Sequence, residues 1–129
     1  MNKPFKLSAD RVELLRQLVV YSTECLPEHA EVRGNALASG DNAEDKRAED
    51  KILKDLNDGN EWAWCTVRVS CIWLDFAGED YLGCCSYQSQ EDFETPGGYY
   101  DDMKEQAFQA LIQQIEACAG SLKLLDGTV

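Results

Sequence analysis

Residues 62–76 read WAWCTVRVSCIWLDF, and no other stretch of the chain has so regular a strand pattern. One set of alternate positions is apolar (Cys65, Val67, Val69, Cys71 and Trp73), and the set between them is polar (Thr66, Arg68 and Ser70). A period of two residues is typical of a strand that buries one face. We therefore expect a strand over residues 62–76 with the first set in the core. Trp62 and Trp64 are assigned to the edge of the core in preference to a binding surface.

The residues that follow predict a hairpin. Ala77-Gly78-Glu79-Asp80 has the composition of a turn, and Tyr81–Ser89 would return as an antiparallel strand. Gly83 within that strand indicates a bulge or a close backbone approach. The polar stretch from Gln88 to Gly98 either folds back through Phe93 or supplies a short third strand.

Three segments have helical signals. The first runs from Ala9 to about Cys25, with Ser8 as its N-cap. The second runs from Asn42 to Asn57, between an Asp41 cap and a Gly59 terminator. The third begins near Tyr99 to Asp101 and is expected to end at about Ala119, before Gly120.

These elements predict an α+β fold in the order α-α-β-β-(β)-α. The simplest arrangement is an antiparallel β-hairpin or three-stranded sheet with helices packed on one face. At 129 residues the chain is expected to be a single acidic domain over 1–129. Within it, 26–40 is predicted to be a loop and 120–129 a C-terminal tail.

The charge of the chain restricts its partners. It has 24 acidic and 12 basic residues and a pI near 4.3. Such a charge repels nucleic acid and anionic lipid and favours a basic protein surface, although solubility alone is the competing explanation. The sequence has no apolar run long enough for a bilayer and no apolar leader near its start, so a cytoplasmic protein without membrane or direct nucleic-acid binding is expected.

The acidic residues are clustered. Between Asp75 and Glu105 there are nine acids and one base, which give −8 of the total charge of −12 within 31 residues. Six aromatic residues lie in the same stretch, so it is the predicted binding region. The candidate partner-binding residues are Glu79, Asp80, Glu91, Asp92, Glu94, Tyr99, Tyr100, Asp101 and Asp102.

No motif of catalysis or cofactor binding is present in the sequence. The only histidine is His29, and we interpret it as a loop residue. The cysteine spacing C-x5-C-x12-C-C lacks the C-x2-C pair of a zinc site, so the six cysteines are expected to be reduced thiols packed as small apolar groups. No metal or cofactor is predicted.

The expected function is therefore a non-enzymatic acidic protein-binding domain that engages the basic groove of a nucleic-acid-handling protein. By class, the chain resembles inhibitors carried by phages and plasmids, including those that block restriction or CRISPR machinery; the resemblance covers no specific residue. Two alternatives stay open. One is a small metal-dependent hydrolase that uses Asp101, Glu105 and neighbouring acids. The other is an interaction module or homodimer anchored by Trp62, Trp64, Tyr99 and Tyr100.

Overall fold

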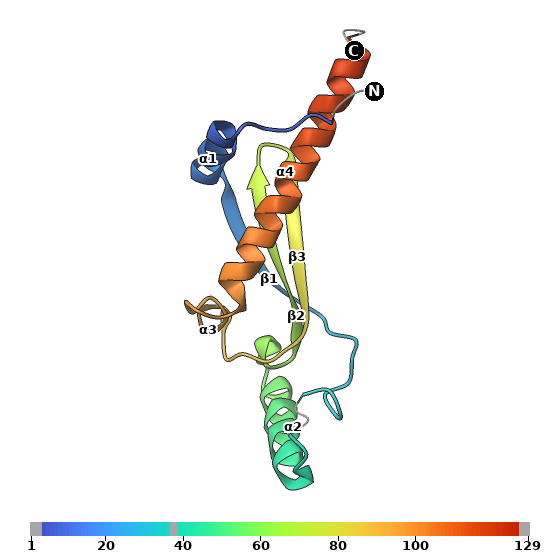
Figure 1. The fold of residues 1–129 in the computed structure, drawn as a ribbon. Coiled ribbons are helices and arrows are strands. Elements are labelled where there is room, and N and C mark those ends of the chain that lie inside the picture. Colours follow the sequence, from blue (N-terminus) through green and yellow to red (C-terminus); the bar gives the residue numbers. More distant parts are fainter. Residues whose placement is uncertain (1–3, 37–38, 127–129) are drawn as a thin grey trace. The chain divides into compact units, whose positions relative to one another are not determined.

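The computed structural model describes residues 4–36 and 39–126. Its elements are α1 (Ala9–Leu18), β1 (Val20–Leu26), α2 (Asn42–Asn57), the short 3-10 helix η1 (Glu61–Ala63), β2 (Cys65–Trp73), β3 (Phe76–Cys85), α3 (Gln90–Phe93) and α4 (Tyr99–Leu125). The strands form one antiparallel sheet in the order β1-β2-β3 (Figure 1). The predicted α+β class is confirmed.

The chain divides into two compact units, and all three strands contribute to both. Of the described residues, the first unit contains 4–22, 69–80 and 102–126, and the second contains 23–36, 39–68 and 81–101. Each unit has its own buried residues. Those of the first include Leu15, Val69, Cys71, Met103, Ala107, Phe108, Leu111 and Ile112; those of the second include Val32, Ala63, Trp64, Cys65, Val67, Cys85 and Phe93.

Strand β2 has the predicted burial pattern from Cys65 to Val69, but Ser70, expected on the exposed face, is buried, and Trp73, expected in the core, is only half-buried. Val67, Val69 and Cys71 are completely buried, whereas Thr66 and Arg68 between them are only half-buried. Arg68 Nη2 donates to Glu24 Oε2 of β1 at 2.6 Å. The polar side of β2 is therefore used for contacts with the neighbouring strand.

The predicted hairpin turn at residues 77–80 is wrong. The turn is Leu74–Asp75, with Leu74 in the left-handed region at φ 53°, and residues 77–80 belong to β3. Gly78 is needed for a different reason. Within the first unit α4 crosses one face of the strands (Figure 1), and a methyl group at position 78 would overlap the backbone of Ala107 and Leu111. The glycine therefore permits close helix–strand packing.

The first helix is shorter than predicted. It begins after the Ser8 cap, whose Oγ accepts from the Arg11 N–H at 3.3 Å, but it ends at Leu18. Val20–Leu26 forms β1 instead and supplies the third strand of the sheet. The apolar residues of this segment fit both the helical period of 3.6 residues and the strand period of two. Its β-branched side chains and its pairing with β2 favour the strand.

The polar stretch 88–98 and the end of the last helix also differ from expectation. Gln90–Phe93 is the helical turn α3, so no third strand forms there. Helix α4 passes through Gly120 and ends at Leu125, which places 120–125 of the predicted tail in the helix, while 127–129 lie outside the described residues. Within the loop predicted over 26–40, the described residues after Leu26 contain no helix or strand.

Helix α2 is confirmed at both ends. The Asp41 side chain accepts from the N–H groups of Ala43 and Glu44, at 3.0 and 3.2 Å. At the other end Gly59 has φ 99°, and its N–H donates to the Leu56 carbonyl at 3.0 Å. Local capping chemistry was sufficient to locate this helix.

We expect Gly78→Ala to destabilise the protein by about 3 kcal/mol, because the added methyl group overlaps α4 backbone that cannot move without repacking the first unit. Gly98→Ala is the matched control, since its methyl group would lie 3.5 Å from the Thr95 carbonyl oxygen. Urea unfolding followed by tryptophan fluorescence measures both. Equal stability of the two variants would contradict the close approach.

Candidate functional site

The nine predicted binding residues are divided between the two units. Glu79, Asp80 and Asp102 belong to the first; Glu91, Asp92, Glu94, Tyr99, Tyr100 and Asp101 belong to the second. In the second unit Glu91, Asp92, Tyr99 and Asp101 are exposed, while Glu94 and Tyr100 are half-buried. The candidate surface is therefore built from the six residues of the second unit.

Helix α3 holds the first of these acids in place. Ser89 is its N-cap and accepts from the Asp92 N–H at 3.2 Å, and Asp92 Oδ2 accepts from the Gln88 N–H at 3.0 Å. This reciprocal arrangement resembles a capping box. Phe93 follows and is only 1 % exposed. The turn that carries Glu91 and Asp92 is consequently fixed by both polar and apolar contacts.

Phe93 is the centre of an aromatic cluster. Its ring centroid lies 6.0 Å from Trp62, 5.1 Å from Tyr87 and 5.8 Å from Tyr100. Trp64 is buried and donates through Nε1 to the Ala30 carbonyl at 2.8 Å. The assignment of Trp64 to the core is confirmed. Tyr99, which is 61 % exposed, is the aromatic residue of this region most open to a partner.

Two of the predicted acids have structural contacts of their own. Glu94 accepts from Thr23 Oγ1 at 3.4 Å and from Gln90 Nε2 at 3.2 Å. Asp101 Oδ2 accepts from the Gly97 N–H at 3.3 Å. Part of the acidity predicted to bind a partner therefore holds the segment between α3 and α4 together.

Two hollows share Tyr87 in their lining. The larger, about 260 Å³, is lined by Lys51, Ile52, Asp55, Ser86, Tyr87, Gln88 and Asp92. The smaller, about 170 Å³, is lined by Leu82, Gly83, Cys84, Cys85, Ser86, Tyr87 and Tyr99. Burial raises the pKa of Tyr87, so its phenol stays neutral at physiological pH. The two hollows thus share the neutral Tyr87. The larger hollow also has the Asp92 carboxylate in its lining, and the smaller has the exposed Tyr99. We call these two hollows the Tyr87 surface, and we include in it the exposed Glu91, which precedes Asp92 in α3.

A hydrogen-bond network around the half-buried Glu28 was not predicted from the sequence. The Glu28 carboxylate accepts from the Cys84 N–H, from the Ala30 N–H at 3.1 Å and from Thr66 Oγ1 at 3.1 Å. The hydrogen bonds from the Cys84 and Ala30 N–H groups lower the pKa of Glu28 to about 2. Glu28 therefore fastens the loop after β1 to both β2 and β3.

Gly83 was the sequence signal for this network. A side chain at Gly83 would begin 3.1 Å from Glu28 Oε1, and Cys84 beside it adopts φ 55°. The close approach predicted at Gly83 therefore occurs, but its partner is a carboxylate 55 positions away in the sequence rather than a neighbouring backbone. The left-handed Cys84 turns its N–H toward that carboxylate.

The six cysteines have free thiols. Four of them belong to the second unit, namely Cys25, Cys65, Cys84 and Cys85. Burial raises the pKa of Cys65, and it raises the pKa of Cys85 to about 11. His29, in the loop after β1, is exposed. Among residues 4–36 and 39–126, no three His, Cys, Asp or Glu side chains are grouped so as to hold a metal ion.

Glu105, one of the two carboxylates of the hydrolase alternative, has a structural partner. Arg16 of α1 donates to both of its oxygens, at 2.7 and 2.9 Å, and the guanidinium lies 4.2 Å from the centroid of the Phe108 ring. The hydrogen bonds from Arg16 and Gln109 lower the pKa of Glu105 to about 2. This carboxylate joins α1 to α4 within the first unit.

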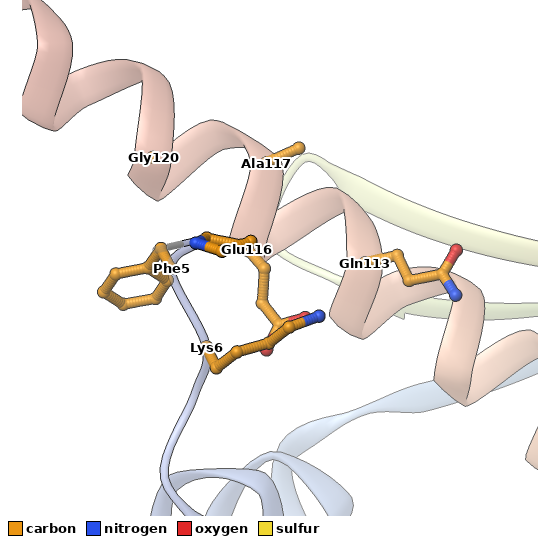
Figure 2. Close-up of a pocket in the computed structure, with 7 residues that line it drawn as sticks. Phe5, Lys6, Gln113, Glu116, Ala117 and Gly120 are labelled. Atoms are coloured by element: carbon orange, nitrogen blue, oxygen red, sulfur yellow. The ribbon is translucent and has the colours of Figure 1, made fainter. Parts of the chain in front are cut away.

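The first unit has a separate pocket of about 290 Å³ between the N-terminal segment and α4. It is lined by Pro4, Phe5, Lys6, Gln113, Glu116, Ala117 and Gly120. Figure 2 shows the Glu116 side chain reaching toward Lys6; the two charged groups are 3.6 Å apart, and the other Glu116 oxygen accepts from the Leu7 N–H at 2.8 Å. The N-terminal segment therefore forms one wall of this pocket, and the Glu116 carboxylate of α4 is already engaged by that segment.

No family model matches the chain, and no curated protein or solved structure matches it. Within the part of the chain that the structure describes, no helix combines the length and the apolar character needed to cross a membrane.

Glu28→Gln should lower the free energy of unfolding by about 1 kcal/mol at pH 7, because a neutral amide oxygen accepts more weakly and its NH₂ group cannot accept at all. A lowered folded-state pKa stabilises the protein above the ordinary pKa of Glu, and this stabilisation is lost as pH falls toward about 2. The difference between wild type and variant should therefore be largest above about pH 5 and shrink toward pH 2. Urea unfolding over that range measures it. A difference that is independent of pH would contradict the network.

Proposed function

We propose that this chain is a non-enzymatic binding protein and that its partner presents a basic surface to the Tyr87 surface. The observation that carries the proposal is the pairing of two hollows around Tyr87, with Asp92 lining one and Tyr99 lining the other. The lining of the larger hollow also contains Lys51, which is paired with Asp55 at 2.8 Å, so Asp92 is the carboxylate that this hollow offers to an inserted basic side chain.

Arginine is the side chain that best fits such lining. Its guanidinium pairs with carboxylates and also stacks on aromatic faces, and Asp92 and Tyr87 in the larger hollow offer it both kinds of contact. The turn that carries Asp92 is held by Ser89 and Phe93, and little conformational entropy is lost when a partner binds a surface that is already ordered.

The charge around the surface favours the same class of partner. Residues 69–103 contain no lysine or arginine, so the acids of this stretch face little neutralisation from their sequence neighbours. With a net charge of −12 the chain attracts a basic protein before contact. Association should therefore be fast at low salt and should slow as salt screens the charges.

The finer proposal is that the partner is a nucleic-acid-handling protein of the restriction or CRISPR type, and that the chain inhibits it by occupying its groove. Carboxylates take the place of phosphates there, and tyrosines take the place of stacked bases. Support for this step comes from the composition of the surface: acids and tyrosines together are what a groove lined by Arg and Lys would bind.

Glu91→Lys tests the electrostatic part. Tagged wild-type protein and variant are used to capture proteins from a bacterial lysate at low and at high salt, and the retained proteins are identified by mass spectrometry. The partner should be retained by wild type at low salt and released at high salt. With the purified partner, Glu91→Lys should lower the association rate about tenfold at low salt.

Glu44→Lys is the matched control, because it makes the same change of charge at an exposed position in the first turn of α2. It should leave binding close to that of wild type. If both variants weaken binding equally, the effect is one of total charge, and the Tyr87 surface is not the binding site.

Tyr99→Ala tests the aromatic part of the same surface. Loss of the ring should raise the dissociation rate about tenfold with little change in the association rate, whereas Tyr99→Phe should keep most of the affinity. Surface plasmon resonance separates the two rates. A Tyr99→Ala variant with unchanged dissociation would exclude Tyr99 from the interface.

A further inference from the structure

The strands of the first unit have one face covered by α4 and one face that is open. Successive side chains of a strand point to opposite faces, so contacts with α4 identify the covered face. A methyl group at Gly78 of β3 would overlap the Ala107 backbone of α4. The Tyr21 ring of β1 lies 5.9 Å from Lys104 Nζ of the same helix, and the completely buried Cys71 of β2 lies on this side too. The residues of the first unit that point to the other face are Val20, Ser22, Ser70, Ile72, Ala77 and Glu79.

The end of this open face next to the hairpin turn is apolar. Val20 begins β1, Ile72 lies one residue before the end of β2, and Ala77 is the second residue of β3. Because neighbouring strands are antiparallel, these three residues lie in a row across the same end of the sheet. Val20 is 63 % exposed, Ile72 is 37 % exposed and Ala77 is half-buried. Ser70, farther from the turn on β2, is buried, so the accessible part of the central strand on this face is its apolar end.

Helix α1 packs against α4 rather than over this row. The Arg16 guanidinium of α1 lies 4.2 Å from the centroid of the Phe108 ring and donates to Glu105. Among residues 4–36 and 39–126, the exposed leucine, isoleucine and valine side chains all belong to the first unit. The aliphatic surface that the described chain offers to a partner is therefore concentrated in this unit.

The hairpin turn places a leucine where leucine is unfavourable. Leu74 has φ 53° and is 72 % exposed. Two-residue hairpin turns ordinarily use Gly, Asn or Asp at a left-handed position, because a larger side chain crowds the backbone there. An exposed leucine gains no burial in return, and strain of this kind is typical of functional positions. We call the surface formed by Val20, Ile72, Leu74 and Ala77 the hairpin face.

The charges beside the hairpin face are all negative. Asp75 in the turn and Glu79 on β3 are exposed carboxylates, and residues 69–80 contain no lysine or arginine. A second copy of the chain would bring the same carboxylates and a net charge of −12, and an anionic membrane would be repelled in the same way. A partner that carries lysine or arginine beside apolar side chains is complementary.

We propose that the hairpin face is a docking surface for a basic amphipathic helix of another protein, with Leu74 as its apolar anchor. Neighbouring strands lie about 4.8 Å apart, so a row across three strands is about 10 Å wide, which is the diameter of one helix. Helix α4 already packs on the opposite face of the same strands (Figure 1), and sheets with helices on both faces are a common layer arrangement. The inference does not rest on the Tyr87 surface, which belongs to the second unit.

The test uses two fluorescent synthetic helical peptides with the same leucine stripe, one with lysine and the other with glutamate on its polar face. Fluorescence anisotropy measures their binding to the full-length protein at about 0.15 M salt. The lysine peptide should bind and the glutamate peptide should not. Amide NMR should place the lysine peptide at Val20, Ile72, Leu74 and Ala77. Equal binding of both peptides, or shifts confined to the Tyr87 surface, would overturn the proposal; the second result would leave the Tyr87 surface as the basic-partner site.

Leu74→Asn separates anchoring from folding. It should weaken binding of the lysine peptide about tenfold, because the apolar anchor is lost. It should also raise the melting temperature by about 3 °C in circular dichroism, because Asn tolerates the left-handed conformation. Leu124→Asn is the matched control, since it makes the same change at a leucine of α4 that is 63 % exposed. It should bind the peptide as wild type does.

Three results with these variants would contradict the proposal. Equal affinity of Leu74→Asn and Leu124→Asn would exclude Leu74 as the anchor. A lower melting temperature of Leu74→Asn would make the leucine a structural residue. Sedimentation of wild type tests the other occupants: a dimer that Leu74→Asn dissociates would assign the hairpin face to a second copy, and Leu74-dependent binding to phosphatidylcholine–phosphatidylserine vesicles would assign it to a membrane.

Discussion

The second unit depends on one carboxylate. Glu28 lies just after β1, and it accepts hydrogen bonds from the loop at Ala30, from β2 at Thr66 and from β3 at Cys84. Without this acceptor the Cys84 N–H, in its left-handed turn, would have to find another partner. The position of the β3 end follows from this network, and residues 82–87 of that end form a wall of the smaller hollow at Tyr87. A structural carboxylate thus supports a surface that we propose to be functional.

The acidic residues of the chain have two kinds of role, and the structure separates them. Glu28, Glu94 and Glu105 accept hydrogen bonds that hold segments together. Glu91 is exposed on a turn that others hold in place. Net charge alone therefore overstates the acidity offered to a partner. Binding is proposed to rest on the few acids and the tyrosine that surround the hollows, while the remaining charge contributes long-range attraction.

Local signals predicted the elements that local chemistry decides. The Asp41 cap and Gly59 located α2, and the alternation from Cys65 to Val69 identified the buried face of β2. Long-range contacts decided the rest. Residues 20–26 fit a helix or a strand until β2 is placed beside them, and Gly78 fits a turn or a close approach until α4 is placed over it.

The acids of 91–101 were found as candidates because they are neighbours in sequence. Gly83 marked one end of the Glu28 network, but its partner lies more than 50 positions away and could not be identified locally, and the hollows beside Tyr87 depend on how α2 and the residues after β3 pack.

The most direct test of this account is the pKa of Glu28 itself. Carboxyl carbon NMR of the labelled protein, titrated from pH 7 downward, follows this group separately from the other acids. The account predicts that Glu28 titrates at about 2, because its backbone donors favour the charged form. Titration near 4.5, the ordinary value for Glu, would mean that the carboxylate does not hold the loop, β2 and β3 together, and the described basis of the Tyr87 surface would be wrong.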